Sequence, residues 1–452
     1  MKLFKRLFAL VLTLGFVGSA VACAGGADKG AGGYYGAMNG GYDVMGSMGE
    51  AMEDVEVGEV EKGEEVASGE NDSVVEEIIQ KPAGLITAGA WNDNTYYDDW
   101  KKLFDANEGT GKFSNYQGEN SWGFSSYNRI KITVKNGETP IPGTRVTLLD
   151  SANEAVFTAV ADANGVAYVF TDEAEGTLLV SCGEAVQTLE FTAENRDLVA
   201  EFNELSYPSP KLDVIELMFV VDVTGSMGDE LNYLKNEIAD VVNRVATSNG
   251  AAKINLALLF YRDHGDNEVF KYFDFEDVTN AAGLEKQQQA LNEQFADGGG
   301  DWPEAVDEAL ELAVNKQWST GVSTKIIFHV LDAPPHSGSS NQTKYREAVI
   351  KAAEKGIRLC PVLCSGADYL TEYLTRQAAI YTGGTFVFVT DDSGIGNAHH
   401  DPNIPNAVVE ALNSLMVRLI NGYHTGTFAP PVYWKEEVEN VISSQYREQD
   451  KR

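Results

Sequence analysis

The second half of the chain alternates apolar runs with amphipathic stretches, and this alternation limits the fold more than any other feature. The run VIELMFVVD at 214–222 precedes a stretch in which Leu231, Leu234 and Ile238 recur at spacings of three and four, as on one face of a helix. Further runs, INLALLFY, KIIFHVLD, IRLCPVLC and TFVFVT, are separated by other helix-like stretches. Continuously apolar strands are typical of sheets covered by helices on both faces. Residues 212–424 are therefore predicted to form a doubly wound, mostly parallel α/β sheet.

The loops that follow these strands are the place to look for a site, because such sheets bind ligands outside the carboxyl ends of their strands. The loops read DVTGSMGDE, YRDHGD, GGGDWPEA and LDAPPHSG. In the first, Asp222, Thr224 and Ser226 offer one carboxylate and two hydroxyls at i, i+2 and i+4. These hard oxygen donors suit Mg²⁺ or Ca²⁺ better than zinc or copper. The sequence thus predicts a divalent cation at this edge.

The loops DVTGSM, GGGD and LDAPPH, in that order on an α/β chain, resemble the metal-ion-dependent adhesion site of the von Willebrand factor type A domain. The resemblance spans residues 212–424. It implies that Asp222, Thr224 and Ser226 bind Mg²⁺, or Ca²⁺ or Mn²⁺, and that Asp332 joins them from its own loop. It also implies a domain that binds a protein partner through the ion and performs no covalent chemistry.

The chain departs from the family in the second loop, where Asp301 stands in place of the usual Thr and is included among the metal ligands. Three aspartates around one dication would over-neutralise it. We therefore expect a poor Lewis acid that takes a polar or water-mediated ligand, or a mainly structural ion, rather than an acidic side chain of a partner.

The candidate residues also have structural interpretations. Asp222 and Ser226 could cap the helix that follows them, and Asp301 could cap a helix that begins at Trp302. Asp332 could simply occupy the stiff turn before its two prolines.

Enzyme chemistry is the main functional alternative. A strand followed by D-x-T-G-S also resembles haloacid-dehalogenase-type phosphatases, in which Asp222 would be the nucleophile and TDDSGIGN at 390–397 an acidic metal loop. GGGDWPEA and LDAPPH have no place in that scheme, so a non-enzymatic binding domain is favoured. The YRD at 261–263 superficially resembles a kinase loop but lacks the accompanying Gly-rich loop and strand lysine, although Asp263 could support the metal. His336, His399 and His400 are too scattered for a ligand set and are expected to be solvent-facing loop residues. A structural envelope protein with a vestigial site is the third alternative.

Residues 129–205 consist of short β-branched runs between turn signals such as KNGETPIPG and DANG, which predict a small antiparallel β-sandwich. The phrases PIPGTRVTLLD and DANGVAYVF resemble carboxypeptidase-regulatory-like or Ig-like modules of bacterial surface proteins. A spacer or adhesion module is expected here. The aromatic-rich segment 85–128 should be buried against something but is assigned no fold, and the tail 425–452 is assigned no position.

The first residues are typical of an export signal, with Lys2 and Lys5 before an apolar run and small residues ending at Ala22. Residues 1–22 are predicted to be removed and Cys23 to be lipidated, with plain cleavage and secretion as the alternative. Residues 23–84, first Gly-rich and then acidic, are predicted to be a flexible tether. The expected location is the cell envelope or surface, with the membrane contacted only through the lipid.

Composition excludes other classes of partner. The chain carries 34 Lys and Arg against 68 Asp and Glu, a formal charge of −34, and no basic block appears. Nucleic acid is therefore excluded as a ligand, whereas cations and polar partners are favoured. The remaining cysteines, Cys182, Cys360 and Cys364, are too few for a disulfide scaffold, and the last two are interpreted as buried thiols, with a disulfide between them as the alternative.

Overall fold

The computed structural model describes residues 85–439, apart from 108, 204–211, 251, 301, 394–401, 403 and 405. The predicted signal peptide, the tether and Cys23 lie outside the described residues, as does Asp301. The chain divides into the units Met1–Val75 and Glu76–Arg452, and everything described below belongs to the second. Within the described part, no helix combines the length and the apolar character needed to cross a membrane.

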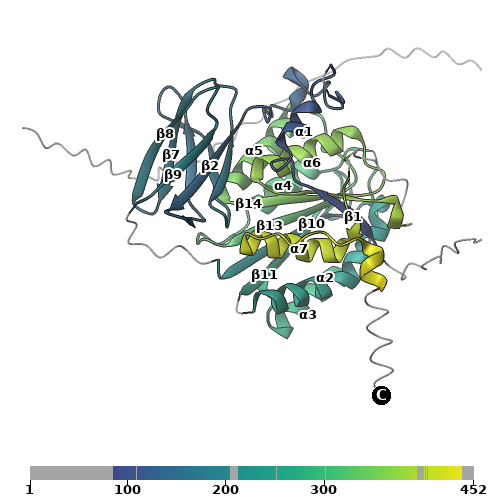
Figure 1. Ribbon diagram of the computed structural model, residues 1–452. Coiled ribbons are helices and arrows are strands. Elements are labelled where there is room, and N and C mark those ends of the chain that lie inside the picture. Colours follow the sequence, from purple (N-terminus) through teal and green to yellow (C-terminus); the bar gives the residue numbers. More distant parts are fainter. Residues whose placement is uncertain are drawn as a thin grey trace, which may run out of the picture. The chain divides into compact units, whose positions relative to one another are not determined.

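The centre of the second unit is an eight-stranded sheet with the strand order β12-β11-β10-β13-β14-β15-β1-β16 (Figure 1). The inner neighbours from β11 to β15 pair in parallel, whereas β12, β1 and β16 pair antiparallel. This confirms the predicted mostly parallel α/β class. The strands are β10 (Val214–Asp222), β11 (Lys253–Tyr261), β12 (Phe270–Asp277), β13 (Thr324–Leu331), β14 (Ile357–Leu363), β15 (Phe386–Val389), β1 (Thr87–Trp91) and β16 (Glu410–Ala411).

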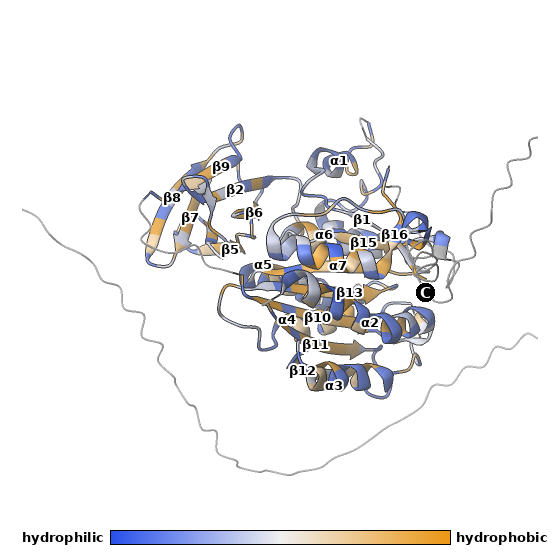
Figure 2. Cartoon of the chain, turned by 60° about the horizontal axis from the view of Figure 1, so that its bottom comes forward, coloured by the Kyte–Doolittle hydropathy of each residue, from blue (hydrophilic) through white to orange (hydrophobic). Residues whose placement is uncertain are grey.

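Helices cover both faces of this sheet, which explains why its strands are apolar without alternation. Alternate residues of β10 enter different cores: Leu217 and Phe219 pack with α2, α3 and α7, and Met218 and Val220 with α4, α5 and α6. Figure 2 shows the hydrophobic strands between helices whose outer surfaces are hydrophilic. The helices are α2 (Gly228–Asn249), α3 (Ala281–Asn292), α7 (Leu412–Thr425), α4 (Val306–Val314), α5 (Ser339–Lys355) and α6 (Tyr369–Thr382).

The aromatic-rich segment that received no fold from its sequence is built onto the α/β sheet. Strand β1 inserts between β15 and β16, and in Figure 1 it lies, in dark blue, among elements of the second half of the chain. After it come α1 (Tyr97–Lys102) and the short 3₁₀ helix η1 (Gly118–Ser121). Trp100 and Phe113 are fully buried, and Phe113 packs edge-on against Tyr373 of α6, with 5.4 Å between ring centroids. This packing accounts for the aromatic content of the segment.

The strand-rich region forms two four-stranded sheets. One prediction about it was wrong in detail, because β9 pairs with β2 in parallel, with Lys131 opposite Asp197, and the region is therefore not purely antiparallel. Each sheet is apolar only on its inner face, as the alternating burial along β2 and β4 shows. The strands are β2 (Arg129–Asn136), β3 (Thr139–Pro140), β6 (Val166–Phe170) and β9 (Asp197–Glu201) in one sheet, and β4 (Arg145–Leu149), β5 (Ala155–Val160), β7 (Gly176–Cys182) and β8 (Ala185–Phe191) in the other.

Aromatic side chains join this sandwich to the helices of the α/β sheet. Tyr381 of α6 stacks on Phe170, with ring centroids 4.5 Å apart, and meets Phe157 edge-on at 5.9 Å. Arg358 adds a hydrogen bond from its guanidinium to the carbonyl oxygen of Val160 at 3.0 Å. The contact is therefore both apolar and hydrogen-bonded.

The two cysteines of the IRLCPVLC run are buried thiols. Cys360 lies in β14 and Cys364 directly after it, and neither forms a disulfide. Burial raises the pKa of Cys360 to about 12, so the thiol stays protonated and unreactive at neutral pH.

His329, in the middle of β13, is a buried neutral imidazole whose Nε2 lies 3.3 Å from the hydroxyl of Tyr261. Burial lowers its pKa to about 3. In the unfolded chain the imidazole takes up a proton below about pH 6.5, whereas the folded chain resists this until about pH 3. Above about pH 6.5, the pKa of this imidazole in the unfolded chain, the buried neutral ring contributes fully to the stability of the fold. That contribution is lost as the pH falls below this value.

We expect a His329→Gln variant to escape this loss. The free energy of unfolding of the wild type, relative to the variant, should fall by about 2 kcal/mol between pH 6.5 and 4.5. Urea unfolding of both proteins across this range measures the difference, since all other titrating groups are common to the pair. A difference that does not change with pH would contradict the prediction.

Candidate metal centre

Asp222 is the last residue of β10 and is fully buried. Its Oδ1 accepts hydrogen bonds from the backbone N–H of Thr224 at 2.9 Å and from the Thr224 hydroxyl at 2.7 Å. Its Oδ2 is buried and has no hydrogen-bond partner. A carboxylate oxygen removed from water without a partner is costly, so this atom marks a position where a cation would be stabilised.

The hydroxyls of the first loop lie beside this carboxylate. The Oγ atoms of Thr224 and Ser226 are 3.5 Å apart, Thr224 being buried and Ser226 exposed. Neither the 3₁₀ turn η2 (Gly225–Met227) nor α2 has a side-chain cap, so the interpretation of Asp222 and Ser226 as capping residues was wrong. The three oxygen-bearing side chains instead contact one another directly after the carboxyl end of β10.

Asp332 follows β13, the strand next to β10, and the structure brings it to Asp222. Burial raises the pKa of Asp332 to about 6, although hydrogen bonding to Ser226 acts in the opposite direction. Burial, and after it the charge of Asp332, raises the pKa of Asp222 to about 7. The predicted convergence of these residues is therefore present in the fold.

Glu304 is a member of the cluster that sequence reasoning missed. It is 4% exposed, and its Oε2 is buried without a hydrogen-bond partner. Burial and then the charges of Asp222, Asp263 and Asp332 raise its pKa to about 9. The sequence offers this residue as a candidate, since Glu304 is the only carboxylate in WPEA and lies three residues after Asp301.

The local fold explains why Glu304 reaches the site. The helix expected from Trp302 begins only at Val306, with Ala305 as its N-cap. Instead, the chain is extended enough for the N–H of Glu304 to donate to the carbonyl of Pro334 at 3.0 Å. This bond ties the GGGDWPEA loop to the loop that carries Asp332.

The glycines of that loop permit its close approach to the first loop. Gly299 has φ of 74°, and a Cβ there would lie 2.8 Å from Glu304 Oε1 and 2.9 Å from the Thr224 Cβ. Its N–H donates to Asp266 Oδ2 at 2.8 Å. A side chain at Gly299 would therefore displace the groups that form the site.

These residues fit a divalent cation. Asp222, Asp332 and Glu304 are buried together, and among the described residues none forms an ion pair with Lys or Arg. Two of them keep a buried oxygen without a partner, and two hydroxyls lie alongside. Such a set of hard oxygen donors is what Mg²⁺, Ca²⁺ and Mn²⁺ prefer.

The nearby histidines correct one expectation. His336 was expected to be a scattered, solvent-facing residue, yet its Nε2 lies 2.8 Å from Asp263 Oδ1. His264 lies next to it, with 5.4 Å between ring centroids. The two loops are distant in sequence but meet at the carboxyl end of the sheet. The other histidines weighed with His336, His399 and His400, lie outside the described residues.

Residues 216–380 match the family model described as the von Willebrand factor A domain. The chain is 36% identical over 98 residues to human von Willebrand factor A domain-containing protein 7, and the match covers 22% of this chain and 10% of that protein. It is 24% identical over 131 residues to the alpha-protein kinase vwkA of Dictyostelium discoideum, covering 27% and 19%. The chain thus spans less than a fifth of the length of either relative.

Among solved structures, the pilus adhesin SpaC of Lactobacillus rhamnosus GG is 10% identical, with 53% of this chain and 33% of that chain covered and a TM-score of 0.31. The hypothetical protein BatB of Bacteroides thetaiotaomicron is 16% identical, with 53% and 100% covered and a TM-score of 0.26. With the family match and the sheet topology together, the protein contains a von Willebrand factor A domain, as its motifs suggested.

Proposed function

We propose that this domain binds a partner protein through a divalent cation held by Asp222, Thr224, Ser226 and Asp332, with Glu304 as a further carboxylate. The observation that carries the proposal is the buried, unpartnered Oδ2 of Asp222, which lies among other buried carboxylates at the carboxyl end of a parallel sheet. The bound ion would supply a Lewis-acidic point for an oxygen atom of the partner.

Each residue has a distinct part in this proposal. Thr224 orients Asp222 by donating two hydrogen bonds to Oδ1, which leaves Oδ2 for the cation. Ser226 is exposed, so the partner would approach from its side of the site. Exposed aromatic side chains of Phe295 and Trp302, on the loop preceding Glu304, offer apolar contact at 62% and 44% exposure.

The charge of the site bears on the kind of ligand. Asp222, Asp332 and Glu304 carry three carboxylates where a dication needs two, and Asp301 remains a proposed fourth. A neutral oxygen, from an amide, a hydroxyl or a bridging water, suits this surplus better than an acidic side chain. An Asp301→Thr variant that retains metal but binds its partner unchanged would contradict the contribution of Asp301.

We expect export to the envelope or surface, with Cys23 as the lipid attachment point, to place the domain where it meets its partner. Mass spectrometry of the chain purified from membranes tests the lipid directly. An unmodified, soluble mature form would contradict the anchor and leave the binding proposal standing.

A pull-down with the wild type in Mg²⁺ and in chelator tests the binding proposal. Partners should be retained only in Mg²⁺ and should be lost by Asp222→Ala in both conditions. Glu285→Ala, which removes an exposed carboxylate of α3, is the matched control and should behave as wild type. Partners that persist in chelator and on Asp222→Ala would contradict metal-mediated binding, and hydrolysis of an aryl phosphate abolished by the same substitution would favour the phosphatase alternative.

A further inference from the structure

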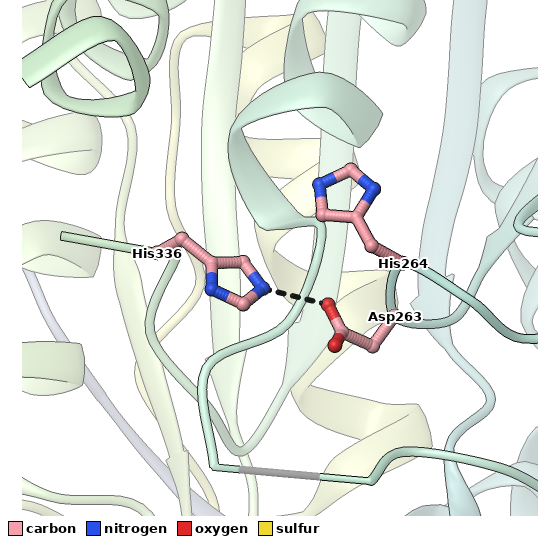
Figure 3. A group of neighbouring side chains, drawn as sticks. All are labelled: Asp263, His264 and His336. Atoms are coloured by element: carbon pink, nitrogen blue, oxygen red, sulfur yellow. Dashed lines mark hydrogen bonds and ion pairs between the residues drawn. The ribbon is translucent and has the colours of Figure 1, made fainter. Parts of the chain in front are cut away.

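A second group of metal-ligand side chains lies beside the carboxylate site, formed by Asp263, His264 and His336 (Figure 3). One potential ligand atom from each residue lies within 4.8 Å of those of the other two. Asp263 and His264 come from the loop after β11, and His336 faces them from the loop after β13. The group is thus assembled from two loops of the same sheet edge.

Backbone hydrogen bonds hold these loops in place. The N–H of Asp263 donates to Asp266 Oδ2 at 3.2 Å, and the same carboxylate oxygen accepts from Gly299. The loop closes where the N–H of Arg262 donates to the carbonyl of Val269 at 3.0 Å. His336 follows two prolines, the first of which accepts the hydrogen bond from Glu304. Asp263 and His336 are therefore presented by ordered backbone.

The burial of the three side chains suits a site that is open to solvent on one side. The side chain of Asp263 is 4% exposed and that of His336 is 27% exposed. His264 is exposed, and its ring is tilted by 33° from the ring of His336. An exposed imidazole can change rotamer, so the ring of His264 can turn toward an ion bound by the other two.

The electrostatic surroundings favour a cation at this position. The charge of Asp263 contributes to the raised pKa of both Asp222 and Glu304, so it faces the same anionic cluster. Within the described residues, no Lys or Arg pairs with Asp263. The neighbouring guanidinium of Arg262 is directed elsewhere, because it donates to the carbonyls of Asp297 and Phe295.

We propose that Asp263, His264 and His336 bind a divalent transition-metal ion, for which Zn²⁺ is the natural probe. Two imidazoles and one carboxylate form a borderline-soft set, unlike the purely oxygen set around Asp222. Three protein ligands leave a coordination position for water or for a side chain of a partner. The domain would then carry two neighbouring cation sites, one that prefers a transition-metal ion and one that prefers Mg²⁺ or Ca²⁺. This inference does not rest on the proposed function, because it uses none of the residues assigned to the first site.

Equilibrium dialysis of the untagged, metal-free chain with Zn²⁺, in excess Mg²⁺ to saturate the oxygen site, tests the proposal. One Zn²⁺ per chain should bind, and His264→Ala and His336→Ala should each weaken binding at least tenfold. Asp222→Asn should leave Zn²⁺ binding intact, which separates this site from the first. His424→Ala, which removes the histidine of α7 that hydrogen-bonds Thr324 at the start of β13, should bind as wild type.

Electron paramagnetic resonance with Cu²⁺ in place of Zn²⁺ provides a second readout that counts the ligands. Hyperfine coupling to two imidazole nitrogens is expected in the wild type and to one in His264→Ala. Because His264 is exposed, this variant should fold normally, and a circular dichroism spectrum checks it. Absence of stoichiometric Zn²⁺, or equal affinity of His264→Ala and the wild type, would overturn the proposal.

Discussion

An Asp222→Asn variant should be more stable than the wild type in chelator and less stable than it in saturating Mg²⁺. Burial and the nearby Asp332 raise the pKa of Asp222 to about 7, so at pH 8 the folded chain without metal holds an unfavourable buried charge. An amide removes that charge, while its oxygen can still accept the hydrogen bonds from Thr224. The rise of this pKa from 3.8 to about 7 sets the gain in chelator at up to about 4 kcal/mol.

In Mg²⁺ the order reverses because the wild type is stabilised by binding and the variant is not. At a concentration ten thousand times the dissociation constant, the wild type gains about 5.5 kcal/mol, which exceeds the gain of Asp222→Asn in chelator. Thermal and urea unfolding at pH 8, with and without Mg²⁺, measure both effects. Glu285→Gln, at an exposed position of α3, serves as the charge-matched control and should follow the wild type in both conditions.

Two outcomes would contradict this account. If Asp222→Asn gains as much stability from Mg²⁺ as the wild type does, the ion is bound elsewhere. If the wild type shows no dependence on Mg²⁺, Ca²⁺ or Mn²⁺, the alternative of a structural protein with a vestigial site is favoured.

The largest loss of stability is expected from Arg376→Met on α6. The guanidinium of Arg376 is buried between Asp93, with Nε–Oδ2 at 3.0 Å, and Glu372, with Nη1–Oε1 at 3.0 Å. Glu372 is shared with Lys112, whose Nζ lies 2.6 Å from Oε2. Removing the central cation leaves two buried carboxylates with at most one counter-charge, which costs about 3–5 kcal/mol. Urea unfolding of the variant measures the loss.

A surface pair of the same composition is the control. Arg145 and Glu354 are about half exposed and 3.4 Å apart, so Arg145→Met should cost less than about 1 kcal/mol. Asp93 and Lys112 belong to the segment that carries β1, and Arg376 belongs to the family-matched region. Equal losses in the two variants would contradict the view that this ion network fastens the segment to the domain.

The sheet could be predicted because its signals are local. The residues of α2 that recur at spacings of three and four, among them Leu231, Leu234 and Ile238, are all buried in the structure. The run at 214–222 is the strand β10 to the residue. Since carboxyl ends of parallel strands meet at one edge, the sequence alone predicts that Asp222 and Asp332 lie close together.

The prediction failed where non-local contacts decide. Glu304 was missed because only the late start of α4 and the hydrogen bond from its N–H to the Pro334 carbonyl bring it to the site. Likewise, Asp263 and His336 are 73 positions apart, and nothing in either loop indicates the other.

The sequence by itself determined the α/β class, the helices and strands that build it, and the loops that carry oxygen ligands, because periodicity and strand ends are properties of neighbouring residues. Only the tertiary structure decided that β1 completes the sheet between β15 and β16, that Asp222 retains an unpartnered oxygen, and that two histidines meet Asp263. Burial, pairing and charge at a site arise from contacts between distant segments, which no local pattern encodes.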